Sequence, residues 1–143
     1  MKSLFSTNFS AAQANIALFI LRASVCAFML THGIPKFMNL VGDGPIKFGD
    51  PLGIGATPSF ILIIFAEVVC SIFLLMGFAT RISAFFLFFS MAVAGFIVHA
   101  NDPFATKEKA FLYLVIYLAL MLFGAGKYSV DNLISGSSKK RRG

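Results

Sequence analysis

Two ionisable residues, Arg22 and Glu67, lie inside long apolar stretches of this 143-residue chain. If these stretches cross a membrane, each unpaired charge costs on the order of 3 kcal/mol, and a mutual ion pair removes much of that cost. Such a pair can polarise or protonate a carbonyl on a bound ligand. The alternative is that it only fixes how two helices pack. These two residues are the first candidates for a ligand-binding site.

A second group of polar residues follows the apolar stretches. His32 and Lys36 lie after the first stretch, and His99 ends the third, with Asp102 and Glu108 close behind. Two histidines near carboxylates could bind a metal, but no short ligand spacing such as His-x-x-x-His is present, so no metal site is predicted. Hydrogen bonding at helix ends is one interpretation. The other is that both histidines meet at the mouth of the bundle and exchange protons with a carbonyl-bearing ligand.

Four apolar stretches carry these residues, at about 14–31, 58–78, 82–99 and 110–126. Because a membrane helix needs about 20 residues, each stretch is long enough to cross the hydrocarbon layer. Hydrophobic residues make up 58% of the chain and charged residues 13%, which is too apolar a balance for a soluble domain. We predict an all-α, polytopic membrane protein built as a bundle of four transmembrane helices.

Residues that start or stop helices mark the ends of these stretches. Candidate N-terminal caps are Thr57 before Pro58, Thr80, and Asp102 before Pro103 or Thr106. Gly33 and Pro35 are expected to end or kink the first helix, Gly77 to end the second, and the run Gly124-Ala125-Gly126 to end the fourth. These positions predict a long loop between helices 1 and 2, at about 33–57, and a very short connection between helices 2 and 3.

Distances along the helices place the two buried charges at nearly the same depth. With a rise of 1.5 Å per residue, Arg22 lies about 12 Å and Glu67 about 15 Å from the same side of the membrane. We therefore predict a direct contact between Arg22 and Glu67, beside a small polar pocket with Cys70 and Ser71. Cys26 and Cys70 differ in predicted depth by about 7 to 8 Å, which argues against a disulfide.

The distribution of lysine and arginine sets the expected orientation. If both termini are cytoplasmic, that side holds seven of these residues against four on the other: Lys2, Arg81, Lys127, Lys139, Lys140, Arg141 and Arg142 against Lys36, Lys47, Lys107 and Lys109. We predict cytoplasmic termini, a membrane domain over residues 1–134 and a basic cytoplasmic tail over residues 135–143. The tail is expected to bind anionic membrane lipid rather than nucleic acid.

The segment after the fourth stretch has the pattern Gly-x-Gly-x-Tyr-Ser-x-Asp. It lacks the preceding strand and the Gly-Lys-Ser/Thr ending of a phosphate-binding loop. We assign it a structural role. Gly124 and Gly126 terminate the fourth helix. Ser129 caps a short interfacial helix with Asp131 in its first turn, and Tyr128 lies at the level of the lipid headgroups.

Six motifs occur in a fixed order along the chain: Leu21-Arg22, His32-Gly33-Ile34-Pro35-Lys36, Phe65-Ala66-Glu67, the Gly77 to Arg81 segment, His99, and Gly124 to Asp131. In this order they resemble the DoxX family of small bacterial membrane proteins, over about residues 15–133. The resemblance implies a four-helix membrane bundle in the bacterial cytoplasmic (inner) membrane. Some members are associated with quinone-linked sulfur oxidation or with membrane oxidoreductase complexes that manage oxidative stress.

Three functions are compatible with these observations. The first is a redox-associated membrane subunit that binds a quinone or another lipophilic ligand, with Arg22, Glu67, His32, Lys36 and His99 as ligand-binding candidates. The second is a non-catalytic accessory or assembly protein. The third is a small transporter or lipid-handling protein, which four helices would support only as a homo-oligomer. No motif for flavin, haem or a redox-active dithiol is present, so electron transfer needs a partner oxidoreductase or a diffusible carrier. No catalytic residue is assigned.

Overall fold

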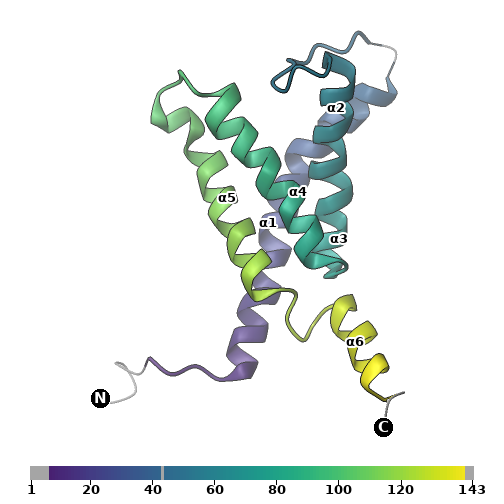
Figure 1. Cartoon of the computed structure of the whole chain (residues 1–143), viewed down its shortest axis with the longest axis vertical. Coiled ribbons are helices and arrows are strands. Elements are labelled where there is room, and N and C mark those ends of the chain that lie inside the picture. The colour runs from purple at the N-terminus through teal and green to yellow at the C-terminus, as the bar shows by residue number, and fades with distance from the viewer. Residues whose placement is uncertain (1–6, 43, 141–143) are drawn as a thin grey trace.

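The computed structural model describes residues 7–42 and 44–140, and all regular structure in these residues is helical (Figure 1). The helices are α1 (Ala11–Val41), α2 (Ala56–Ile64), the π-helical turn η2 (Phe65–Cys70), α3 (Ser71–Met76), α4 (Thr80–Val93), the π-helical turn η3 (Ala94–Val98), α5 (Phe104–Phe123) and α6 (Val130–Lys140). The predicted basic tail begins within α6. Lys2 and the side chains of residues 137–143 lie outside the part of the chain that the structure describes.

α1 is longer than the sequence predicts. It begins with a capping box, in which the Ser10 hydroxyl accepts the Gln13 N–H at 3.2 Å and the Gln13 side chain accepts the Ser10 N–H at 2.7 Å. The prediction that Gly33 and Pro35 end this helix is wrong, because α1 continues through both. Gly33 serves a close contact instead, since a Cβ there would lie only 2.9 Å from the Cβ of Glu67.

The loop between the first two spans is consequently shorter than expected. It covers residues 42–55 rather than 33–57. The Asp50 carboxylate closes this loop by accepting the N–H groups of the two residues that precede α2, at 3.0 and 2.8 Å. The prediction that Thr57 and Pro58 open the helix is wrong by two residues, because both already lie in the first turn of α2.

Glycines with a positive φ end α3 and α5, as predicted. Gly77 has a φ of 69° and Gly124 a φ of 77°. The prediction that Thr80 caps α4 is wrong, because Thr80 is the first helical residue. The cap is the Asp131 carboxylate, which accepts the N–H of Ala79 at 2.8 Å and that of Thr80 at 2.9 Å. A side chain about fifty residues further along the chain therefore starts α4.

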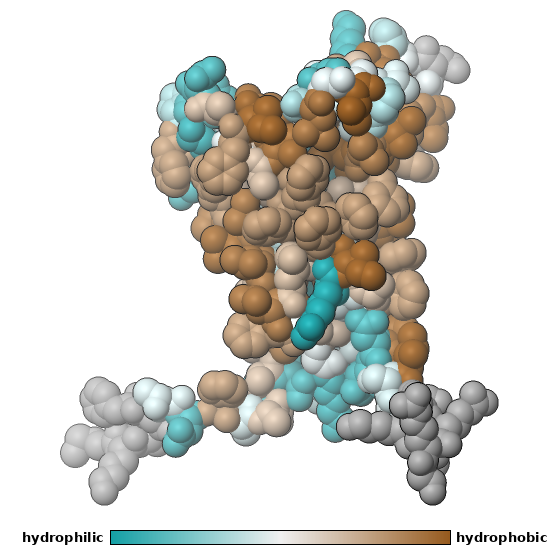
Figure 2. Space-filling model, in the orientation of Figure 1, coloured by the Kyte–Doolittle hydropathy of each residue, from teal (hydrophilic) through white to brown (hydrophobic). Residues whose placement is uncertain are grey.

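Among the described residues, three helical segments are long and apolar enough to cross a membrane: Ala11–Val41, Ala56–Met76 and Thr80–Val98. α5 has 20 residues, but Lys107, Glu108 and Lys109 lie near its start, so a fourth span does not follow from length and composition. Figure 2 shows a broad apolar belt between hydrophilic side chains at the two ends of the molecule. The chain is a membrane protein whose belt is in contact with lipid.

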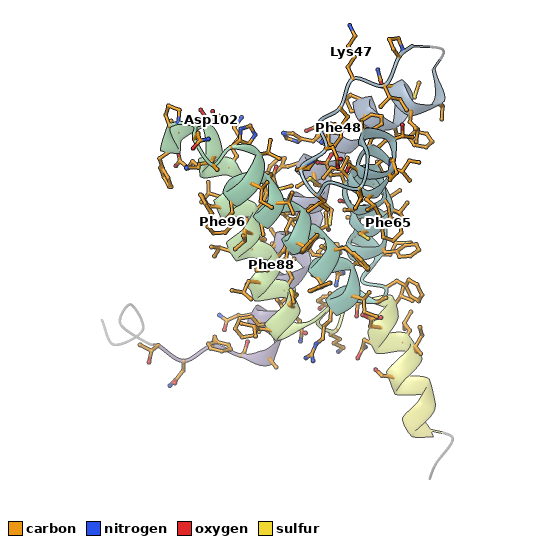
Figure 3. The ribbon with its side chains drawn as sticks, turned by 45° about the horizontal axis from the view of Figure 1, so that its top comes forward. Lys47, Phe48, Phe65, Phe88, Phe96 and Asp102 are labelled. Carbon is orange, nitrogen blue, oxygen red and sulfur yellow. The ribbon has the colours of Figure 1, made fainter. Side chains whose placement is uncertain are left out.

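The helices form a bundle that is closed in the middle and open at one end. In Figure 1, α4 and α5 lie side by side, and they diverge from α1 and α2 toward the top of the view. The closed part holds a core of fully buried side chains, among them Cys26, Leu74, Leu87, Tyr117 and Leu120. Both cysteines are free. Many phenylalanines face outward, including Phe65 and Phe96 on opposite sides of the bundle (Figure 3).

Candidate ligand-binding site

Glu67 lies in the π-helical turn η2 and faces α1. Both of its carboxylate oxygens accept hydrogen bonds from the Lys36 ammonium, at 2.6 and 2.7 Å. The glutamate side chain is 4% exposed and the lysine side chain 32%. Sequence reasoning placed Lys36 beyond the end of the helix and missed this ion pair. The spacing from Gly33 could have indicated it, because residues three apart share one helix face.

Arg22 is 1% exposed and has backbone partners. Its guanidinium donates hydrogen bonds to the carbonyl oxygens of Ala125 and Tyr128, in the corner between α5 and α6. Gly77 packs against the same group, and a Cβ there would lie 2.7 Å from Arg22 Nη1 and 2.5 Å from the Cβ of Ser129. Arg22 therefore joins α1, the end of α3 and the α5–α6 corner.

The predicted contact between Arg22 and Glu67 does not form. Gly33 touches Glu67, and Arg22 lies eleven residues before Gly33, which places it about 16 Å further along the bundle. Gly77, ten residues after Glu67, lies about 15 Å along in the same direction and meets Arg22. The prediction failed because it aligned the ends of two helices that are not level, since α1 extends beyond the end of α3 (Figure 1).

Three hydrogen bonds that involve side chains hold the corner between α5 and α6. The Ser129 hydroxyl donates to the Gly126 carbonyl at 2.7 Å and accepts the Asn132 N–H at 3.2 Å, which caps the start of α6. The Lys127 N–H donates to the Asn15 side chain on α1 at 2.7 Å. The corner thus supplies structural contacts, while the Tyr128 ring is 52% exposed.

A groove of about 570 Å³ lies between α1 and α5. Its walls are mostly apolar and are formed by Leu21, Val25, Phe28, Leu112 and Ile116. Four of its five polar residues, Thr31, His32, Lys109 and Tyr113, lie toward the open end, and the fifth is Ser24. An apolar cavity of this size with a few polar groups is typical of small-molecule sites. Phe28 and Leu112 are 61% and 58% exposed, so the groove opens toward lipid.

His32 offers a free ring nitrogen in this groove. Its Nδ1 lies 3.0 Å from the Phe28 carbonyl oxygen, and because a carbonyl only accepts, Nδ1 carries the proton. The neutral imidazole then presents Nε2 as an acceptor. The ring packs edge-on against Tyr113, with the centroids 6.3 Å apart. Neither the Tyr113 hydroxyl nor the Lys109 ammonium makes a hydrogen bond within residues 7–42 and 44–140.

A pair of tyrosines connects the groove with the buried carboxylate. Tyr113 and Tyr117 stack along α5 with their ring centroids 6.1 Å apart. Glu67 is close enough to interact electrostatically with both hydroxyls. Tyr117 is fully buried, and its hydroxyl has no hydrogen-bond partner in the described structure. The charge of Glu67 thus acts on the tyrosine that lines the groove and on the one behind it in the core.

His99 occupies a different place. Its Nδ1 lies 2.6 Å from Asp102 Oδ2 in the turn between η3 and α5. The Lys107 ammonium donates to the Ala100 carbonyl at 3.0 Å in the same turn. His99 does not line the α1–α5 groove, and no contact joins it to His32 in the described residues. The structure therefore does not bring the two histidines together, and His99 bonds within its own turn, as in the interpretation of hydrogen bonding at helix ends. Among the described residues no three His, Cys, Asp or Glu side chains group closely enough to hold a metal.

Comparison with known proteins places these features in a family. A protein of Haemophilus influenzae, named only as an uncharacterized protein, is 33% identical over 119 residues, which cover 78% of this chain and 86% of its own length. A second uncharacterized protein of this species is 27% identical over 128 residues, or 85% of both chains. No solved structure matches. The DoxX family model matches residues 17–100, which hold Arg22, Lys36 and Glu67, and the chain therefore belongs to the DoxX family.

Proposed function

We propose that this protein binds a lipophilic ligand of the quinone class in the α1–α5 groove, as a redox-associated component of a membrane oxidoreductase system. The observation that carries this proposal is the meeting of an apolar groove with three free polar groups, on His32, Tyr113 and Lys109. A quinone fits this groove, because its head carries carbonyl oxygens that can meet the polar groups and its tail is apolar like the walls. The head lies toward the open end, and the tail follows the apolar wall into lipid.

The free groups suit both redox forms of such a head. The Tyr113 hydroxyl and the Lys109 ammonium donate to the carbonyl oxygens of a quinone, whereas Nε2 of neutral His32 accepts a hydrogen bond from the hydroxyl of a quinol. Oxidation of a quinol releases two protons and two electrons. His32 can take up one proton, and the second passes to water at the open end of the groove. A partner protein must accept both electrons, because this chain contains no motif for a redox cofactor.

The proposal includes the placement of the chain in the bacterial inner membrane. α5 is the fourth span, with its first turns in the headgroup region, where Lys107 and Lys109 extend toward water. Both termini then lie on the cytoplasmic side, together with most of the lysines and arginines. The Lys36–Glu67 pair holds α1 beside η2, and Arg22 holds an earlier part of α1 against the α5–α6 corner.

Thermal unfolding with a short-chain quinol, kept in its reduced form, tests this function, because the quinol is the form that donates a hydrogen bond to His32. A ligand that binds only the folded state raises the melting temperature progressively with its concentration. We expect this rise for the wild type and for His99→Gln, because His99 lies outside the groove, and its loss in His32→Gln. Glutamine retains a donor and an acceptor, so the basal stability of both variants should stay near that of the wild type. The absence of any shift in the wild type would reject the proposal and favour a non-catalytic accessory protein.

A further inference from the structure

A second cavity, of about 690 Å³, lies at the end of the bundle opposite the open mouth of the groove. It is formed by the start of α4, the end of α5 and the first two turns of α6, which lie together at the lower end in Figure 1. Its lining combines polar side chains with two large apolar ones: Thr80, Arg81, Asn132 and Ser135 with Ile82 and Phe123. No residue of the α1–α5 groove contributes to it.

Arg81 is the unsatisfied charge of this cavity. It is exposed, and its guanidinium makes no hydrogen bond or ion pair in the part of the chain that the structure describes. The Asn132 side chain is likewise without a hydrogen bond there. The backbone of the α5–α6 corner lies behind the guanidinium, because a Cβ at Gly124 would be 3.7 Å from Arg81 Nε. The side-chain N–H donors of Arg81 and Asn132 thus lie at the cavity and are available to a ligand.

The carboxylate in the same cavity does not neutralise Arg81. Asp131 accepts the N–H groups of Ala79 and Thr80 with its two oxygens, and it interacts electrostatically with the buried Arg22. Burial raises the pKa of Asp131, but the hydrogen bonds from Thr80 and Ala79 outweigh burial and keep this pKa below its ordinary value. Asp131 is therefore ionised and already engaged, and the positive charge of Arg81 has no counterpart among residues 7–42 and 44–140.

The apolar part of the cavity faces the surroundings. Ile82 and Phe123 are 64% and 73% exposed and lie next to the polar groups. Figure 2 shows hydrophilic side chains at the lower end of the molecule that reach upward into the apolar belt. A guanidinium beside exposed apolar side chains, at the border of a lipid-facing belt, matches a molecule with an anionic head and hydrocarbon chains.

We propose that this cavity binds the phosphate group of an anionic phospholipid. Arg81 donates to the two non-bridging phosphate oxygens in the forked geometry that guanidinium groups favour, Asn132 donates to one of the same oxygens, and the acyl chains pack on Ile82 and Phe123. The shared chemistry is a phosphate group, which a free phosphate ion also carries. The exposed apolar residues assign the site to the lipid rather than to the ion.

Melting temperatures of the full-length protein in an uncharged detergent test this site. The titrants are short-chain phosphatidylglycerol, short-chain phosphatidylcholine and inorganic phosphate. Arg81→Gln removes the free cation, and Lys47→Gln is the matched control, because Lys47 is an exposed cation at the far end of the molecule from α6 (Figure 3). We expect phosphatidylglycerol to stabilise the wild type and Lys47→Gln more than phosphatidylcholine does, with about tenfold weaker apparent binding in Arg81→Gln.

Two results would overturn the assignment. Equal stabilisation of Arg81→Gln and Lys47→Gln by phosphatidylglycerol would show that Arg81 does not hold the headgroup. An Arg81-dependent rise produced by inorganic phosphate as strongly as by phosphatidylglycerol would show that the occupant is a free ion and not a lipid. Because Arg81 has no partner within the described residues, Arg81→Gln is expected to fold with the basal stability of the wild type.

Discussion

Arg22 and Glu67 are both buried charges, but their surroundings neutralise them in different ways. Arg22 donates to the carbonyls of Ala125 and Tyr128, which follow the end of α5 and have no helical N–H partner. One guanidinium thus satisfies two acceptors that would be costly to leave unpaired in an apolar layer. Glu67 faces a cation instead, because Lys36 reaches it from α1. Arg22 connects α1 with the α5–α6 corner, and Glu67 connects η2 with α1 through Lys36.

Double-mutant cycles separate these two arrangements. Glu67→Ala leaves the Lys36 ammonium unpaired. The double variant Glu67→Ala with Lys36→Met should therefore lose less stability than the sum of the two single variants. We expect a difference of about 1 kcal/mol, because Lys36 is partly exposed. Glu67→Ala with Arg22→Leu should be additive to within about 0.5 kcal/mol, since the two side chains share no partner. Thermal unfolding in detergent measures both cycles. Coupling between Arg22 and Glu67 would contradict the arrangement described above.

At the scale of elements, Asp131 links the start of α6 to the start of α4. Its carboxylate caps α4 through Ala79 and Thr80, and its own N–H donates to the Gly77 carbonyl at 2.9 Å. The connection between α3 and α4 can therefore be very short, because a side chain from another element completes the helix start. The same contacts fix α6 below the bundle and shape the cavity at Arg81.

The charge of this cap makes its contribution dependent on pH. The folded-state pKa of Asp131 is lowered, so the stability that its carboxylate adds is present above the unfolded pKa, about 3.9, and is lost as the pH falls through the folded value. Asp131→Asn should therefore cost about 1 kcal/mol at pH 7, and the difference from the wild type should shrink below about pH 4. Thermal unfolding of both proteins across this range measures the difference. A difference that does not change with pH would mean that the charge plays no part in capping.

At the scale of the whole molecule, hydropathy located the spans but not their mutual placement. The stretches predicted at 58–78 and 82–99 correspond to the observed segments 56–76 and 80–98. They could be located because a membrane span consists of consecutive apolar residues. The partners of buried charges depend on how far each helix extends past its neighbour. α1 runs on through Gly33 and Pro35, which moves Lys36 into reach of Glu67. No local sequence pattern shows how far α1 extends past the neighbouring helix.

The groove between α1 and α5 could not be predicted from the sequence for a related reason. Its two walls come from α1 and α5, which lie far apart in the sequence, and most of the side chains that line it are ordinary residues of apolar helices. His32 was singled out by its residue type, but its separation from His99 and its position beside Tyr113 follow only from the tertiary packing. Residue type thus indicated one member of the site, and the packing of α5 against α1 supplied the others.

The most direct measurement is the amount of quinone that copurifies with the protein from bacterial membranes in mild detergent, determined by mass spectrometry. Ser24 and Ala27 are small, exposed residues on α1, and only Ser24 lines the groove, so Ser24→Trp fills the site and Ala27→Trp is its matched control. We predict near-stoichiometric quinone with the wild type and with Ala27→Trp, and severalfold less with Ser24→Trp. Wild-type protein that carries no more quinone than an unrelated membrane protein purified alongside it, or equal amounts in both tryptophan variants, would contradict ligand binding in the groove.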